Sequence, residues 1–185
     1  MNNIINLNTV DLVFSSKDII LLDTNIWIYL FYPLGNYGIK TSNKYSSIYK
    51  KIINSKSKVI VPATVISEFF NTCLRFEFSL LKDLDSKKYK DFKKDFRGTE
   101  EYQKSVEKLS ETIKNIILKN STVVNDLFEC IDIDNILVID EEFDFNDKLI
   151  IEICKKYGAK LLTHDKDFKK YKIDFPLDIL TFNNS

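Results

Sequence analysis

Residues 17–31, KDIILLDTNIWIYLF, constrain the fold of this chain most strongly. The apolar run Ile19–Leu22 is short and continuous, which is typical of a parallel strand that is covered on both faces. Thr24 or Asn25 can cap a helix that begins directly after it. We therefore expect a strand that ends at Asp23, where open α/β sheets bind their ligands. Asp23 is then either a helix cap or a ligand-binding carboxylate.

Two later segments have the same organisation. A strand predicted at residues 58–62 is followed by a helix predicted at 63–75, and another strand is predicted at 160–163. Acidic side chains stand at or just beyond the ends of these strands: Glu68, Asp165 and Asp167. The repeated strand-to-helix order predicts an α/β fold with a parallel sheet.

The remaining strands and the last helix are assigned more simply. Residues 136–139 are an apolar run and a third strand candidate, and residues 178–182 form a last short strand. An acidic stretch after residue 139 is followed by a predicted helix. Asn146 can cap its start, Asp147 lies in its first turn, and Gly158 can end it in the left-handed conformation. Residues 1–16 either add an edge strand or lie outside the sheet.

Residues 76–131 differ in character, with apolar residues at helical spacing and almost no strand pattern. A helix is expected to begin at Thr99, and a short one is expected at 123–130. We predict one domain over residues 1–185, in which 76–131 is a helical elaboration. The expected architecture is a three-layer α/β/α sandwich around a mainly parallel sheet of four or five strands.

The amino-acid composition limits the class of protein but does not indicate a binding partner. Lys and Arg together number 27, as do Asp and Glu, so the net charge is zero. Three well-separated cysteines, Cys73, Cys130 and Cys154, fit buried thiols in a reducing compartment, with no metal-ligand spacing. No segment approaches the ~18 apolar residues of a membrane helix. We expect a cytoplasmic protein without membrane contact.

The acids at the strand ends predict a metal site. A parallel sheet brings its carboxyl edges together, so Asp23, Glu68, Asp147 and Asp165 are expected to converge. Crowded carboxylates repel one another unless some are protonated or a cation lies among them. Hard oxygen ligands suit Mg²⁺ or Mn²⁺, which also bind phosphate oxygens and lower the pKa of a bound water. This donor set points to phosphodiester or phosphate chemistry.

These motifs resemble the PIN-domain ribonucleases, the fold of the VapC-type toxins of bacterial toxin–antitoxin pairs. The resemblance lies in LLDTNIWIYL at 21–30, VPATVISEFF at 61–70 and FNDKLIIEICKKYGAKLLTHDKDF at 145–168, and does not extend over 76–131. It implies that the four acids named above bind the metal and are catalytic, that Asp167 is a further metal ligand, and that neighbouring polar side chains support them: Thr24, Asn25 and Thr163. It also implies an RNA substrate, an antitoxin partner and a homodimer.

Other functions remain open at this stage. A PIN-like module that binds RNA or protein without turnover would be expected to lose these acids, and this chain retains them. A haloacid-dehalogenase-type phosphatase needs a second acid two residues after its nucleophile, where this chain has Asn25. His164, the only histidine, is not needed as a base if a metal generates the nucleophile. Asp144 is interpreted as a helix cap.

Overall fold

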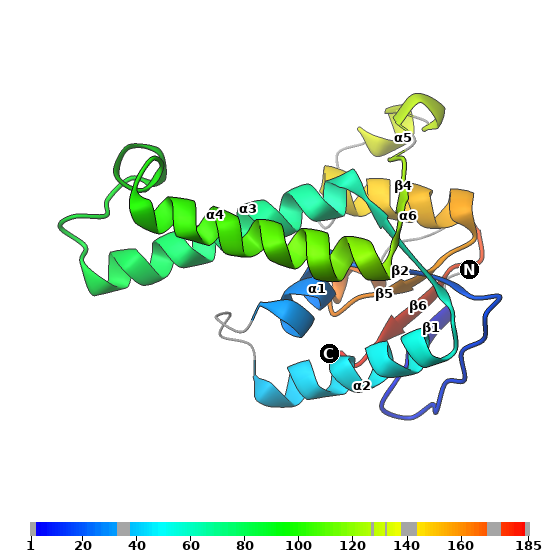
Figure 1. Ribbon diagram of the computed structural model, residues 1–185. Helices are drawn as coiled ribbons and strands as arrows, with labels where there is room; N and C mark the ends of the chain where they lie inside the picture. Colours follow the sequence, from blue (N-terminus) through cyan, green and yellow to red (C-terminus); the bar gives the residue numbers. More distant parts are fainter. Residues whose placement is uncertain are drawn as a thin grey trace.

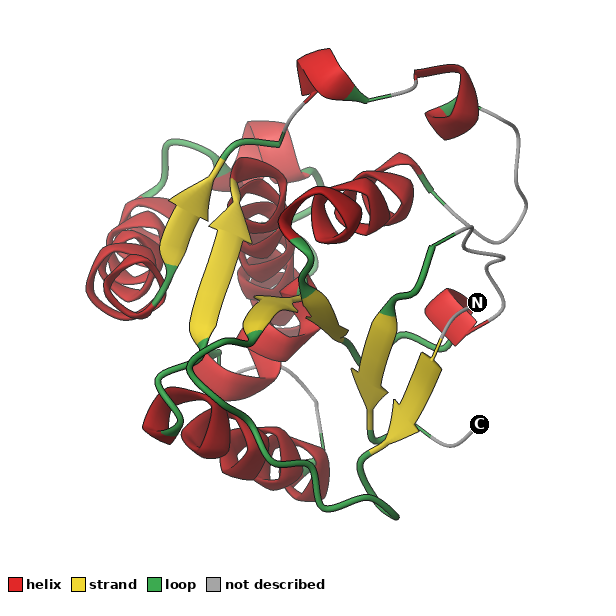
Figure 2. Cartoon of the chain, turned by 90° about the vertical axis from the view of Figure 1, so that its right-hand side faces the viewer, coloured by secondary structure: helices red, strands yellow, loops and turns green. Residues whose placement is uncertain are grey.

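The computed structural model describes residues 3–32, 38–126, 128–131, 133–137, 144–169 and 175–183. Six strands form one sheet in the order β1-β6-β5-β2-β3-β4, and every pairing is parallel. Figure 2 shows the strands with helices packed around them. The predicted architecture is confirmed, with one or two strands more than expected.

The strands and helices follow one another in a simple order. The strands are β1 (Asn3–Asn6), β2 (Ile19–Leu22), β3 (Lys58–Pro62), β4 (Thr122–Val124), β5 (Lys160–Leu162) and β6 (Asp178–Thr181). The α-helices are α1 (Thr24–Phe31), α2 (Ile39–Asn54), α3 (Ala63–Leu84), α4 (Glu100–Thr112), α5 (Ile133–Ile136) and α6 (Phe145–Tyr157). Short 3₁₀ or π turns are η1 (Phe92–Phe96), η2 (Ile113–Ile117), η3 (Leu118–Asn120), η4 (Phe128–Cys130) and η5 (Asp167–Lys169).

The order of the strands places the helices in two outer layers. From β2 the chain moves to β3 and then β4, and it returns through α6 to β5 on the other side of β2. Parallel crossovers are right-handed in nearly all proteins, so reversing the direction moves the connecting helix to the opposite face. In Figure 1 the sheet lies between α2 below and α6 above. Helix α1 contacts α2 and α3, which makes these three one layer.

The core explains why β2 is a continuous apolar run. Its residues Ile20, Leu21 and Leu22 are fully buried because strands pair on both edges and helices cover both faces. Strand β3 on one side and β5 on the other are also almost entirely buried. Residues 3–6 do add an edge strand, which pairs with β6.

Helices α3 and α4 form a long hairpin that extends beyond the sheet (Figure 1). Helix α4 begins where expected, because the Thr99 hydroxyl accepts a hydrogen bond from the Tyr102 amide. A cluster of rings ties the far end of the hairpin together; it contains Phe78, Phe92, Phe96 and Tyr102. The predicted elaboration at 76–131 is thus mainly helical, although α3 runs into it from residue 63.

Three sequence-based assignments need correction. The strand predicted at 136–139 is wrong for its first two residues. Ile136 is the last residue of α5 and is buried there, and Leu137 lies in a turn. Residues 138–139 are outside the described residues. The helix predicted at 123–130 is wrong at its start, because Val123 belongs to β4, while its end coincides with the 3₁₀ turn η4. Strand β4 went unpredicted since its three residues, two exposed and one half-buried, carry too little pattern, and only pairing with β3 defines it.

Candidate metal centre

Four acidic residues reach one edge of the sheet from four different elements. Asp23 follows β2, Glu68 lies two turns into α3, Asp147 is in the first turn of α6, and Asp165 follows β5. This edge holds the carboxyl ends of β3, β2 and β5, where the direction of the chain reverses on either side of β2. Such a switch point is where open α/β sheets form a ligand-binding crevice.

Asp23 is the most firmly held of these acids. Its Oδ1 accepts a 2.7 Å hydrogen bond from the Thr24 amide, which makes Asp23 the cap of α1. Its Oδ2 accepts from Asn25 Nδ2 at 2.9 Å and from Thr163 Oγ1 at 2.7 Å. The sequence offered Asp23, Thr24 and Asn25 as caps. Asp23 is the cap, because it has the extended backbone that a capping residue needs, and Thr24 and Asn25 lie inside α1.

Thr163 connects two of the acids. Its hydroxyl donates to Asp23 and accepts a 2.9 Å hydrogen bond from the Asp165 amide. The next link is similar, since Asp165 Oδ1 accepts from the Asp167 amide at 2.8 Å. The segment after β5 is therefore folded back on itself by its own side chains, and Thr163 fixes it against the end of β2.

Thr24 and Asn25 extend this network to α3 and to the loop after β5. The Thr24 hydroxyl donates to Glu68 Oε2 at 3.0 Å, which joins the start of α1 to α3. Asn25 Oδ1 accepts from the His164 amide at 3.2 Å. Each polar residue that the sequence singled out as supporting an acid is thus bonded to an acid or to the backbone beside one.

Burial and mutual repulsion act together on the acids. Burial, helped by the negative charges of Glu68 and Asp165, raises the pKa of Asp23 to about 7, against hydrogen bonds that favour its charged form. Burial first, and then the charges of Asp144, Asp23 and Asp165, raise the pKa of Asp147 to about 8. Glu68, Asp147 and Asp165 therefore each interact electrostatically with Asp23.

Asp144 contributes to this field from the end of α6. It caps the helix, since its Oδ1 accepts a 3.0 Å hydrogen bond from the Asp147 amide. The interpretation of Asp144 as a helix cap is thus confirmed, and Asn146, the other candidate, lies within α6. The charge of Asp144 also raises the pKa of Glu68, after the larger effect of burial. An acid directly before a helix start can be recognised from local sequence, whereas the proximity of Asp144 to Glu68 depends on the tertiary fold.

His164 is directed into an aromatic cluster. Its Nδ1 lies 2.9 Å from the Tyr45 hydroxyl, and its ring meets the rings of Tyr29 and Tyr45 edge to face at 5.4 and 5.6 Å. Asn183 Nδ2 donates to its carbonyl. These contacts give His164 a packing role that accounts for its position without any chemistry.

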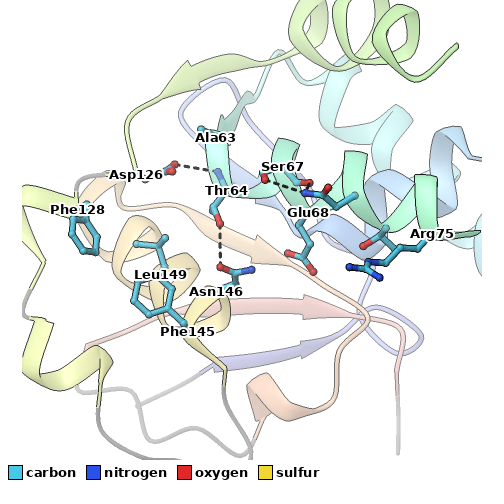
Figure 3. Close-up of a pocket in the computed structure, with 12 residues that line it drawn as sticks. Ala63, Thr64, Ser67, Glu68, Arg75, Asp126, Phe128, Phe145, Asn146 and Leu149 are labelled. Carbon is cyan, nitrogen blue, oxygen red and sulfur yellow. Dashed lines mark hydrogen bonds between the residues drawn. The ribbon is translucent and has the colours of Figure 1, made fainter. Parts of the chain in front are cut away.

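A groove of about 590 Å³ adjoins the acids. Helix α3 forms one wall and the start of α6 the other, and Glu68 belongs to both the groove and the acidic cluster (Figure 3). The groove contains residues that the sequence analysis did not connect: Thr64, Arg75, Asp126, Phe128, Phe145 and Asn146. They come from three separate segments, so no motif in the sequence signals the groove.

The donor set fits a hard divalent cation. It consists of carboxylate oxygens. Burial is the larger cause of the raised pKa values of Asp23 and Asp147, and the negative charges of neighbouring acids raise them further, a repulsion that a cation would offset. Across the described parts of the chain, no three or more His, Cys, Asp or Glu side chains form a group that could hold a metal ion as they stand. The residues therefore have the chemistry for Mg²⁺ or Mn²⁺ without a preassembled ligand shell.

Comparisons with known proteins identify the family. The sequence matches the PIN domain over residues 20–174, which is most of the chain. The chain therefore belongs to the PIN domain family, whose members are generally nucleases. A comparison with curated proteins found no match.

One solved structure with a similar fold is the crystal structure of VapBC2 from Rickettsia felis, bound to a DNA fragment from the promoter of the pair. The likeness covers 86% of this chain and 98% of that chain, with 16% sequence identity and a TM-score of 0.47. Within the part of the chain that the structure describes, none of the helices combines the length and the apolar character needed to cross a membrane.

Proposed function

We propose that this protein is a metal-dependent endoribonuclease that hydrolyses RNA phosphodiester bonds. The observation that carries the proposal is the convergence of Asp23, Glu68, Asp147 and Asp165 from four elements at the switch point of the sheet. Membership of the PIN family supports nuclease chemistry in general.

The four acids, with Asp167, would hold Mg²⁺ or Mn²⁺. A bound ion of this kind supplies an activated water and a contact to the scissile phosphate. The protein's own contribution is to fix the carboxylates: Thr163 and Asn25 orient Asp23, and Thr24 orients Glu68. Because no closed ligand group exists among the described residues, binding of the ion would draw the side chains together.

The test is cleavage of a mixed RNA pool by the purified chain with Mg²⁺ or Mn²⁺. We expect cleavage in either metal, loss of cleavage in EDTA, and loss in Asp23→Asn. Cleavage that persists in EDTA, or in a folded Asp23→Asn protein, would contradict the proposal. RNA binding without cleavage under all metal conditions would instead favour a binding module without turnover.

We further propose that the nuclease is the toxin of a toxin–antitoxin pair in the cytoplasm. Excess negative charge at a partly buried edge attracts a cation, so an Arg or Lys of an antitoxin can replace the metal there. Co-expression with the product of the adjacent gene should give a complex with reduced RNA cleavage. A homodimer is expected from the resemblance to VapC-type toxins, and sedimentation of the purified chain measures it.

A further inference from the structure

Two phenylalanines are exposed side by side at one end of the groove. Phe128 and Phe145 are 60% and 40% exposed, and their ring centroids are 6.4 Å apart with a tilt of 46°. Every other aromatic side chain of the described residues is buried or half-buried. Exposed aromatic rings that adjoin each other beside a site are apolar surface that a ligand can cover.

The rest of the groove is polar and has a cation at its other end. On α3 the groove is lined at helical spacing by hydroxyl, amide and charged side chains, from Thr64 through Glu68 to Arg75. Asn146 faces Thr64 across the groove, with the Thr64 hydroxyl 3.4 Å from Asn146 Oδ1 (Figure 3). Among the described residues of the lining, Arg75 is the one that is basic, and its guanidinium lies 5.4 Å from the centre of the Phe92 ring.

We infer that this groove binds one unpaired nucleotide of the RNA substrate, next to the bond that is cleaved. The inference rests on the proposed ribonuclease function. The base stacks on Phe128 and Phe145, as unpaired bases do on aromatic side chains. The sugar and phosphate lie along α3 toward Arg75 and pass Glu68, which belongs to the acidic cluster as well.

The shape and chemistry of the groove favour a nucleotide over a peptide. Its volume of about 590 Å³ lies within the range of roughly 300–1,000 Å³ of small-molecule sites. The aromatic end of the groove matches the base, the polar walls match the sugar, and the cation at the other end matches the phosphate. An apolar peptide side chain would match the aromatic end but would offer no group to the polar side chains along α3 or to the Arg75 cation.

Asp126 gives the groove a means to select the base. Its Oδ1 lies 3.4 Å from the Thr64 amide, which places the carboxylate at the aromatic end (Figure 3). A carboxylate only accepts hydrogen bonds. Guanine presents two adjacent donors on its Watson–Crick edge, an imino N–H and an amino group, whereas uracil presents one donor between two carbonyl groups. The groove therefore prefers guanine to uracil.

Binding of short RNA oligonucleotides tests the inference. Labelled pentaribonucleotides UUGUU and UUUUU are titrated with the full chain in Mg²⁺, on an Asp23→Asn background that prevents cleavage, and anisotropy is recorded. Phe128→Ala and Phe145→Ala should each weaken binding by between about fivefold and a hundredfold, as loss of one stacking partner does. The matched control is Leu84→Ala, which is 83% exposed at the far end of α3 and should bind as the parent does.

Two further variants examine the phosphate and the base. Arg75→Gln should weaken binding of both oligonucleotides and lower the slope of log affinity against log salt by about one. Lys104→Gln removes a surface cation that is paired with Glu100 on α4 and should leave that slope unchanged. Asp126→Asn retains an oxygen for the Thr64 amide and should abolish the preference for UUGUU.

The outcomes separate this inference from the proposed function. Groove variants that bind RNA as tightly as the parent, or a parent that binds neither oligonucleotide, would overturn the inference even if the wild-type chain cleaves RNA. Groove-dependent binding by a wild-type chain that never cleaves RNA would support the groove as a nucleotide-binding site and refute the nuclease. Variants that weaken only the complex with the product of the adjacent gene would mark the groove as a protein-binding surface and also overturn it.

Discussion

Thr163 Oγ1 and Asp23 Oδ2 are joined by a 2.7 Å hydrogen bond between residues that are 140 positions apart in the sequence. The same hydroxyl accepts the Asp165 amide at 2.9 Å, so one buried side chain holds acids that follow two neighbouring strands. The distance between these acids is therefore set by β2 and β5, whose pairing is rigid, and not by a flexible loop.

Replacing Thr163 by valine should impair both stability and cleavage. Valine keeps the shape but leaves the Asp165 amide without its acceptor and Asp23 without one donor, at a cost of about 1–3 kcal/mol. In a chain of this size that corresponds to a melting temperature lower by roughly 2–10 °C. Thr163→Ser is the matched control, because it retains the hydroxyl, and it should cleave RNA at close to the wild-type rate. Equal loss in the two variants would show that the hydroxyl is not what matters.

The metal-free protein should become less stable as the pH rises toward 8. Asp23 and Asp147 have pKa values near 7 and 8 when folded, above the ~4 of an unfolded aspartate, so the folded state binds more protons between these limits. The free energy of unfolding therefore falls as the pH rises through this window, and the loss is complete above the folded pKa values.

Thermal melts in EDTA between pH 5 and pH 8.5 measure this effect. Asp147→Asn should flatten the dependence, because it removes one of the two titrating groups. Asp83→Asn, an exposed carboxylate on α3, should leave the dependence as it is in the wild type. A melting temperature that rises steadily from pH 5 to pH 8.5 in EDTA would contradict the electrostatic picture of the site.

Mg²⁺ or Mn²⁺ should stabilise the folded chain, and more at high pH than at low pH. A ligand that binds only the folded state adds RT ln(1 + [L]/Kd) to the free energy of unfolding, about 2.7 kcal/mol at a hundred times Kd. Protons compete with the ion for Asp23 and Asp147, so the gain at pH 8 should exceed that at pH 5.5. Melts of the chain without divalent cations are compared, at each pH, with melts after addition of Mg²⁺ or Mn²⁺. An unchanged melting temperature at saturating metal would argue against an ion among these acids.

The parts of the fold that sequence predicted are those with local, repeated patterns. Ile20–Leu22 are buried on all sides and Ile19 is half-buried, so every residue is apolar, and the strand is evident from sequence. Strand β4 has only Thr122–Val124 and is defined by its register with Ile60–Pro62, which no local pattern encodes. Ile136 has the β-branched side chain of a strand, yet a single helical turn buries it equally well.

The site also has parts that local sequence patterns indicate and parts that only tertiary packing defines. Asp23, Asp147 and Asp165 each follow a recognisable strand end or helix start, so the topology alone indicates that they reach one edge of the sheet. The pairing of Thr24 with Glu68 depends on how α1 crosses α3, and the exposed pair Phe128 and Phe145 depends on how two unrelated segments meet. These relationships arise from packing, and the sequence carries no periodic signal of them.

Asp23 and Asp165 should behave as one unit in catalysis. Asp23→Asn alone should remove most RNA cleavage, because Mg²⁺ is held by few direct carboxylates and one loss displaces or releases it. Adding Asp165→Asn should then lower the rate little further, as expected for residues that act together. Asp167→Asn should cost less than either change.

Single-turnover cleavage rates of the two single variants and the double variant give the test. His164→Ala is the control, since its ring packs on Tyr45 and Tyr29, and it should retain most of the activity in a chain that still melts cooperatively. Rates that fall by independent factors, so that the double variant shows the product of the two single losses, would mean that Asp23 and Asp165 serve separate steps and do not share one ion.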